Sequence, residues 1–157
     1  MEIKKVLVIG AGTMGNGIAH VFAQTGYDVY LVDAFDEALK KGIAAIEKNL
    51  GRQLKKGKIT EEEVNAALGR IKGSTNMEDG KDADLAIEAA TENKKIKFEL
   101  FRKMDEMLAP EVILASNTST ISITEIAAQT KRADKVIGMH FMNPVPMMKL
   151  VEVINGL

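Results

Sequence analysis

The feature that most constrains this chain is a six-residue turn, Gly10-Ala11-Gly12-Thr13-Met14-Gly15, placed between a strand and a helix. Residues 6–9 before it are apolar and mostly β-branched, which is typical of a strand buried on both faces. After it, apolar residues recur at helical spacing as far as Gly26, the expected left-handed cap. In this G-x-G-x-x-G pattern the first glycine permits a tight turn, the second lets the backbone approach a pyrophosphate, and the third allows close packing. The pattern predicts a helix N-terminus aimed at a diphosphate.

An acidic residue follows the turn at the distance expected of a dinucleotide-binding unit. A second strand, residues 29–32, ends in Asp33, which lies 18 residues after Gly15. An acid near this spacing bonds the ribose 2′-hydroxyl, and it would repel a 2′-phosphate, so we expect NAD and not NADP. The predicted cofactor-binding residues of this unit are Gly10, Gly12, Thr13, Met14, Gly15 and Asp33.

Composition narrows the classes of function. The 157 residues carry a net charge of −1, so the chain lacks the excess of basic residues that would indicate nucleic-acid binding. The absence of cysteine excludes disulfides, thiolate nucleophiles and zinc-thiolate sites, and two histidines make an all-protein metal site unexpected. No apolar run approaches a membrane span, and the first strand starts too early for a signal peptide, so we expect a cytoplasmic protein.

The rest of the chain alternates between helical and strand patterns. A long helix is expected over 36–58, and Thr60 with Glu63 forms a capping box for a second helix through Leu68. Further strands are expected at 71–75, 85–90, 112–115 and 135–139, and the direction of a last run at 150–154 stays open.

Two more helices are expected, over 94–108 and 122–129. The apolar positions of the first of these, which we expect to face inward, are Ile96, Leu100, Phe101, Met104 and Leu108. The whole pattern predicts one α/β domain over residues 1–157, Rossmann-type and doubly wound, with a mostly parallel sheet and a helical hairpin inserted after the second strand.

Polar residues follow several strands at the edge where such sheets bind ligands. They include Glu92, Asn117 and His140, of which His140 is the best candidate for acid-base chemistry because imidazole titrates near neutral pH. Spacing alone leaves a structural role for His140 equally open. His20 is no rival, because it lies within the first helix. Lys55 and Lys56 favour a solvated helix end, with contact to a phosphate-bearing substrate tail as the alternative.

Five segments together resemble the NAD-binding domain of L-3-hydroxyacyl-CoA dehydrogenases. They are GAGTMGNGIA, AIEAATEN, ILASNTSTISITEIA, KVIGMHFMNPVPMMKLVEVI and the Asp33 acid, and the resemblance extends over essentially the whole chain. The likeness is closest to the 3-hydroxybutyryl-CoA members. It implies an oxidoreductase that passes a hydride from the 3-hydroxyl carbon of a short acyl-CoA to NAD.

The resemblance also implies roles for individual residues. His140 would be the base that removes the hydroxyl proton, and Glu152 would orient its imidazole, as a triad carboxylate does. Ser119 would hydrogen-bond the reacting oxygen of the substrate, and Asn143 would support the same cluster. The residues implied on the cofactor side are Glu92 and Lys97. We also predict that Asn117 binds the cofactor and that Lys55 and Lys56 contact the substrate tail.

One departure from the family concerns length. Family members carry a second, all-helical domain that supplies dimer contacts and one wall of the acyl-CoA cleft, and no such segment follows Leu157 in this sequence. Three interpretations stay open: a truncated chain, a separately encoded half that a homo-oligomer or a helical partner completes, or a fragment. Two other functions stay open: a dehydrogenase of the 3-hydroxyisobutyrate or 6-phosphogluconate type, and a non-catalytic NAD(H)-binding module.

Overall fold

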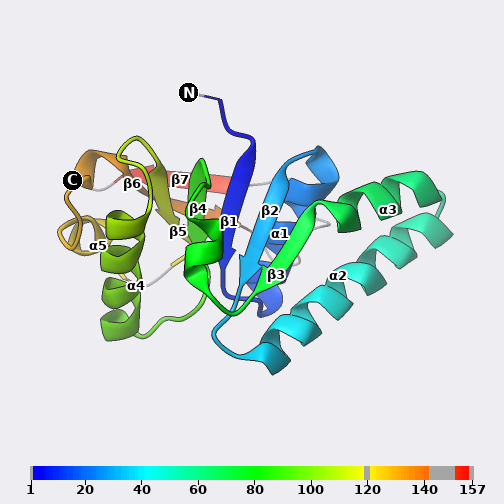
Figure 1. Ribbon diagram of the computed structural model, residues 1–157, viewed down its shortest axis with the longest axis horizontal. Helices are drawn as coiled ribbons and strands as arrows, with labels where there is room; N and C mark the ends of the chain where they lie inside the picture. The colour runs from blue at the N-terminus through cyan, green and yellow to red at the C-terminus, as the bar shows by residue number, and fades with distance from the viewer. Residues whose placement is uncertain (1, 119–120, 142–150, 156–157) are drawn as a thin grey trace.

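A seven-stranded sheet forms the middle layer of the molecule (Figure 1). The computed structural model describes residues 2–118, 121–141 and 151–155, the last segment by its backbone. The strands are β1 (Lys5–Ile9), β2 (Asp28–Val32), β3 (Ile71–Ser74), β4 (Leu85–Glu88), β5 (Ile113–Ser116), β6 (Val136–Phe141) and β7 (Val151–Asn155). Their order is β3-β2-β1-β4-β5-β6-β7, with β1 to β6 parallel and β7 antiparallel to β6. The predicted Rossmann-type, mostly parallel sheet is confirmed, and the direction of the last strand is now assigned.

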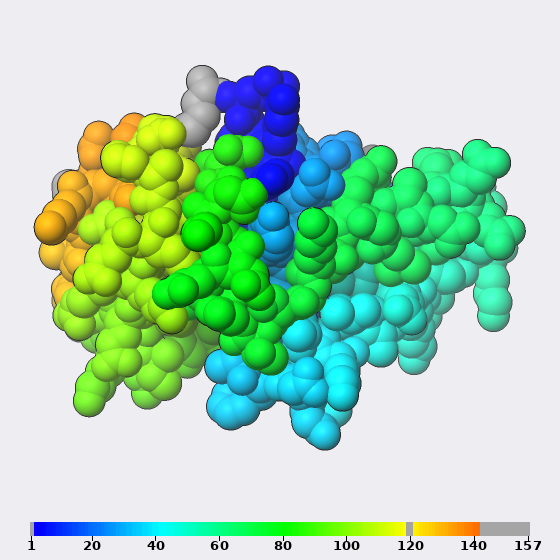
Figure 2. Space-filling view, viewed as in Figure 1, coloured from blue at the N-terminus to red at the C-terminus, as the bar shows by residue number. Residues whose placement is uncertain are grey.

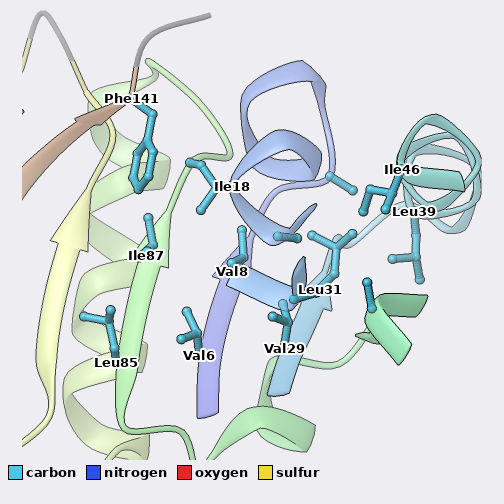
Figure 3. Packing of buried hydrophobic residues seen from close by; sticks show 14 of the residues in the cluster. Val6, Val8, Ile18, Val29, Leu31, Leu39, Ile46, Leu85, Ile87 and Phe141 are labelled. Carbon is cyan, nitrogen blue, oxygen red and sulfur yellow. The ribbon is translucent and has the colours of Figure 1, made fainter. Parts of the chain in front are cut away.

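Helices cover both faces of the sheet, and the alternation along β1 shows why. Val6 and Val8 belong to an apolar cluster with Ile18 of the first helix, whereas Leu7 and Ile9 belong to a second cluster on the opposite face. Figure 3 shows the first cluster, between β1, β2, β4 and the helices that cover them. The helices are α1 (Thr13–Thr25), α2 (Asp36–Lys55), α3 (Glu61–Gly69), α4 (Lys94–Met107) and α5 (Ile123–Ala127), with short 3₁₀ turns η1 (Met77–Gly80) and η2 (Ala133–Lys135).

The predicted helical hairpin is formed by α2 and α3, which project from one end of the sheet (Figures 1 and 2). The Thr60 hydroxyl accepts from Glu63 N at 3.2 Å and the Glu63 carboxylate accepts from Thr60 N at 3.1 Å, so the predicted capping box is present. Helix α2 ends at Lys55, earlier than expected, because Gly57 takes the left-handed conformation at φ +70°.

The expectation that Ile96 faces inward is wrong. Ile96 is 47% exposed, and its neighbour Lys97 is 1% exposed. Successive helical residues point about 100° apart, so only one of the two can face the sheet. The Lys97 ammonium does so because it forms an ion pair with Glu88, which is buried at the end of β4. This pairing overrides the apolar pattern in the first turn of α4, while Phe101, Met104 and Leu108 are buried as expected.

Neither a membrane-spanning helix nor a metal-binding cluster occurs among the described residues. No helix there is both long and apolar enough to cross a bilayer. The same residues contain no group of three or more histidine, cysteine or acidic side chains placed to hold a metal ion.

His20 lies inside the interface between α1 and α2 and is 1% exposed. Its Nε2 lies 2.8 Å from Gln24 Oε1 and 3.3 Å from Gln53 Nε2, and Gln24 donates to Gln53 at 2.8 Å. Within the described residues Nδ1 has no hydrogen-bond partner. Burial lowers the pKa of His20, because the buried ring has little water around it to stabilise a positive charge. The protonated Nδ1–H would also find no acceptor among the described residues.

Folding stability should therefore decline as acid is added. The folded chain takes up the His20 proton less readily than the unfolded chain, so stability is full above the unfolded pKa of about 6.5 and falls as pH drops toward the lower folded pKa. His20→Gln keeps a polar side chain that does not titrate in this range. Urea unfolding at pH 7.5 and 5.5 should show a larger loss in the wild type than in this variant, and equal losses would contradict the assignment.

Candidate active site

The glycine turn between β1 and α1 is held by the close approach of backbone to backbone. Gly10 adopts φ +104°, and a Cβ built there would lie 2.7 Å from the Ala89 carbonyl oxygen. A Cβ on Gly15 would lie 1.6 Å from the carbonyl oxygen of Gly10. A Cβ on Gly12, in contrast, would meet nothing within 4 Å. Two glycines are thus required by the turn itself, and the third leaves open space in front of the helix.

The N-terminus of α1 is suited to an anion. Gly12 is its N-cap and supplies no capping side chain, whereas Thr60, Asn93 and Ser122 cap α3, α4 and α5. The first amide groups of α1 therefore remain available as donors, and the helix dipole adds positive potential there. Together with the space at Gly12, this arrangement fits the pyrophosphate of a dinucleotide.

Asp33 lies at the end of β2 and contacts the glycine turn directly. Its Oδ2 accepts from Ala11 N at 2.9 Å, and its Oδ1 accepts from Phe35 N at 3.0 Å. A carboxylate has about four acceptor positions, so both bonds leave room for a ribose hydroxyl. Asp33 thus shapes the turn besides serving the ribose contact that we expect of it.

A cavity of about 660 Å³ opens beside Asp33 at the carboxyl ends of the strands. Gly10, Thr91 and two large apolar side chains, Phe35 at 74% exposure and Ile96 at 47%, line it. Exposed apolar side chains beside a few polar groups are typical of a pocket for a small molecule. An adenosine group has this mixed character, so the exposure of Ile96, which contradicted the helical pattern, is consistent with a ligand contact.

The ends of β4 and β5 are joined by buried polar side chains. The Glu88 carboxylate forms the ion pair with Lys97 and accepts from Ser116 Oγ at 3.0 Å. Lys97 Nζ also donates to Ser116 Oγ at 3.3 Å. Lys97 is therefore buried against the ends of β4 and β5, and its implied contact with the cofactor stays a prediction.

The loops after these strands hold two other residues that we predict to lie on the cofactor side, Glu92 and Asn117. The Thr118 hydroxyl donates to Glu92 at 2.9 Å, which links the loop after β5 to the loop after β4. Asn117 Oδ1 accepts from Phe141 N at 3.2 Å, so it links the end of β5 to the end of β6. His140, half-buried, precedes Phe141 on β6. Glu92, Asn117 and His140 are thereby brought to one edge of the sheet.

The remaining predicted residues are placed less fully. The backbone register pairs His140 with Glu152 across β6 and β7. Ser119 and Asn143 lie outside the described residues. Lys55 and Lys56 are exposed at the far end of α2, whose 20 residues span about 30 Å, so the structure does not bring them to the cavity.

A scan against protein-family models matches residues 5–157 to the family described as 3-hydroxyacyl-CoA dehydrogenase, NAD binding domain. The match covers nearly the whole chain. The chain belongs to this family. The predicted cofactor, NAD, is thereby confirmed, as is the resemblance on which the roles above rest.

Relatives of this NAD-binding domain are close in sequence and structure. The chain is 52% identical over 157 residues to a probable 3-hydroxybutyryl-CoA dehydrogenase of Bacillus subtilis, covering 100% of this chain and 55% of the relative. It is 48% identical to the mitochondrial hydroxyacyl-coenzyme A dehydrogenase of Rattus norvegicus, covering 98% and 51%. The (S)-3-hydroxybutyryl-CoA dehydrogenase of Ralstonia eutropha superposes with a TM-score of 0.97 at 52% identity, covering 99% of this chain and 55% of that structure. The chain spans about half the length of these relatives.

Two residues of the NAD-binding domain's site escaped the sequence reasoning, although each left a signal. Glu88 is a charged residue inside the buried apolar run of β4, where an unpaired carboxylate would be strongly unfavourable. Gly42 interrupts the helical pattern of α2, and a Cβ there would lie 2.5 Å from the Ala11 carbonyl oxygen. An isolated helical glycine often marks such close packing.

Substituting two glycines of the turn should separate ligand binding from folding. Gly12→Ala adds a Cβ into open space at φ −66°, ψ −170°, so stability should change by less than about 1 kcal/mol. NADH affinity should fall roughly tenfold or more, because the methyl group occupies space needed by the pyrophosphate. Fluorescence titration of NADH and thermal unfolding measure the two effects.

Gly15→Ala is the matched variant. Its Cβ overlaps the Gly10 carbonyl, so it should destabilise the fold by about 1–3 kcal/mol or more. Normal NADH affinity in Gly12→Ala would show that the pyrophosphate does not pass this glycine.

Proposed function

We propose that this chain is the cofactor-binding part of an oxidoreductase that transfers a hydride between NAD and a short-chain 3-hydroxyacyl-CoA, such as 3-hydroxybutyryl-CoA. The observation that carries the proposal is the 52% identity, over the whole chain, to proteins named 3-hydroxybutyryl-CoA dehydrogenases. When bound, NAD supplies the hydride acceptor at its nicotinamide ring. The acyl-CoA substrate, a cytoplasmic location and any homo-oligomer or helical partner belong to the same proposal.

His140 is the residue to which we assign the proton transfer. Loss of a hydride from a carbinol carbon requires a base within hydrogen-bond reach of its hydroxyl, and histidine is the side chain that most often serves as such a base. Asn117 helps to fix the location of His140, because its side-chain oxygen accepts a hydrogen bond from the backbone N–H of the next residue, Phe141. Ser119 would donate a hydrogen bond to the substrate oxygen, and Asn143 would support that contact.

Glu152 is assigned to orienting the imidazole of His140. Directly opposed residues of an antiparallel pair are cross-strand neighbours, so the register of β6 and β7 is compatible with this pairing. A carboxylate beside an imidazole selects its tautomer and stabilises its protonated form. Among the cofactor-side residues, Glu92 is exposed at the strand-end loops and is suited to a ribose contact.

Two alternatives remain to be separated from this function. A dehydrogenase of the 3-hydroxyisobutyrate or 6-phosphogluconate type would use a lysine from a second domain and would not need His140. A non-catalytic NAD(H)-binding module would bind NADH and leave acyl-CoA unchanged. Turnover of acetoacetyl-CoA with NADH, and its dependence on His140, separates the three.

Cofactor preference should depend on Asp33. The wild type should bind NADH roughly ten- to a hundredfold more tightly than NADPH, because the carboxylate accepts from the 2′-hydroxyl and repels a 2′-phosphate. Asp33→Ala also loses the hydrogen bond to Ala11 N, which should weaken the binding of both cofactors to the same extent. The ratio of the two affinities therefore isolates the ribose contact. Fluorescence titrations should show this ratio near one in the variant. Equal affinities in the wild type would refute the assignment.

Catalysis should depend on His140 without involving cofactor affinity. In the protein that carries this chain, His140→Ala should reduce turnover of acetoacetyl-CoA by about 10²–10⁴, the usual contribution of a general base. NADH affinity should change little, because the imidazole acts on the substrate hydroxyl. His20→Gln serves as the control, since His20 lies between α1 and α2, and it should leave turnover unchanged. A His140→Ala protein with near wild-type turnover would point to one of the alternative functions.

A further inference from the structure

Glu88 is a fully buried carboxylate whose two oxygens are each shared between two donors. Oε2 accepts from Ala90 N at 2.8 Å and Thr91 N at 3.3 Å. Oε1 accepts from Ser116 Oγ at 3.0 Å and from the Lys97 ammonium. These donors come from the loop after β4, from the end of β5 and from α4. One side chain with 0% exposure therefore joins three elements at the ligand edge of the sheet.

The first branch of this network shapes the wall of the cofactor cavity. The loop after β4 packs closely against the glycine turn, because a Cβ on Gly10 would lie 2.7 Å from both Ala89 O and Ala90 Cα. Ala90 and Thr91 line the same cavity as Asp33. Because Glu88 accepts from both amide groups of this wall, it fixes the backbone beside the turn.

The second branch reaches the loop after β5. Thr118 N donates to Ser116 Oγ at 3.3 Å, and the Thr118 hydroxyl donates onward to Glu92. The chain of contacts from Glu88 through Ser116 thus ends at an exposed carboxylate on the cofactor side. The two strand-end loops share one buried anchor.

We propose that Glu88 is a positioning residue for the dinucleotide, holding the loops after β4 and β5 in their binding shape while Lys97 supplies the balancing charge. The inference rests on the proposed function, since it presumes that these loops meet NAD. Stability alone does not account for the pair, because apolar residues of similar volume often replace a buried ion pair without loss. Such residues would, however, leave Ala90 N and Thr91 N without their acceptor.

The test compares two double variants, in each of which both charged residues are replaced, so that no buried charge is left without a partner. Glu88→Leu/Lys97→Met removes all four acceptor positions, and we expect about tenfold weaker NADH binding, the effect usual for loss of a supporting outer contact. Amide exchange at Ala90, Thr91 and Thr118 should be faster even without cofactor. Glu88→Gln/Lys97→Met retains a carbonyl for Ala90 N and an amide for Ser116, and it should recover most of the affinity.

A matched control removes the other buried ion pair of α4. Arg132 Nε donates to Asp105 at 2.6 Å, near the opposite end of that helix. Asp105→Leu/Arg132→Met should lower stability, yet it should keep NADH affinity within about twofold, as expected for a distant site. Affinities are compared at a temperature where every variant is folded by circular dichroism.

Each outcome decides the proposal. Wild-type affinity and exchange in a folded Glu88→Leu/Lys97→Met variant would overturn the positioning role and leave the proposed function intact. Failure of the wild type to bind NADH would overturn both. If that double variant does not fold, Ser116→Ala decides, because it keeps the ion pair and cuts only the second branch. It should weaken NADH binding and speed exchange at Thr118, and no change in either would refute the role.

Discussion

The close approach of Gly15 to the Gly10 carbonyl is the constraint on which the rest of the site depends. It lets α1 begin directly at the edge of the sheet, so that its first amide groups lie close to the carboxyl end of β1. It also brings Ala11 within reach of the Asp33 carboxylate and against Gly42 of α2. Three elements thus meet at one turn because several positions there lack a side chain.

The other half of the ligand edge is held by side chains that bond to backbone. Glu88 accepts from the loop after β4, and Asn117 accepts from the end of β6. The Asn117 bond joins two strands that are distant in sequence, whereas the Glu88 bonds to Ala90 N and Thr91 N are local and fix the loop that follows it. A binding surface fixed before the ligand arrives loses less entropy on binding, so such bonds favour affinity without touching the ligand.

Local patterns explain what the sequence predicted well. The glycine turn and the capping box of Thr60 and Glu63 each depend on residues close in the chain, whereas the roles of Asp33, His140 and Glu152 stay predictions. Whether Ile96 or Lys97 faces the sheet depends instead on Glu88, which comes close to Lys97 only when β4 and α4 pack together. A lysine beside an isoleucine in a helix reads as the exposed member of the pair until that partner is known. The bond from Asp33 to Ala11 was missed for the same reason, since it needs β1 and β2 side by side.

The alternation along β1 has a consequence for how this domain can diverge among its relatives. Val6 and Val8 pack on one face of the sheet, and Leu7 and Ile9 pack on the other. A substitution at one residue of β1 is therefore compensated in a different layer from a substitution at its neighbour. The two layers can thus accumulate substitutions independently of each other. Descendants of one ancestor can then differ widely in either core and still present the same phosphate-binding edge.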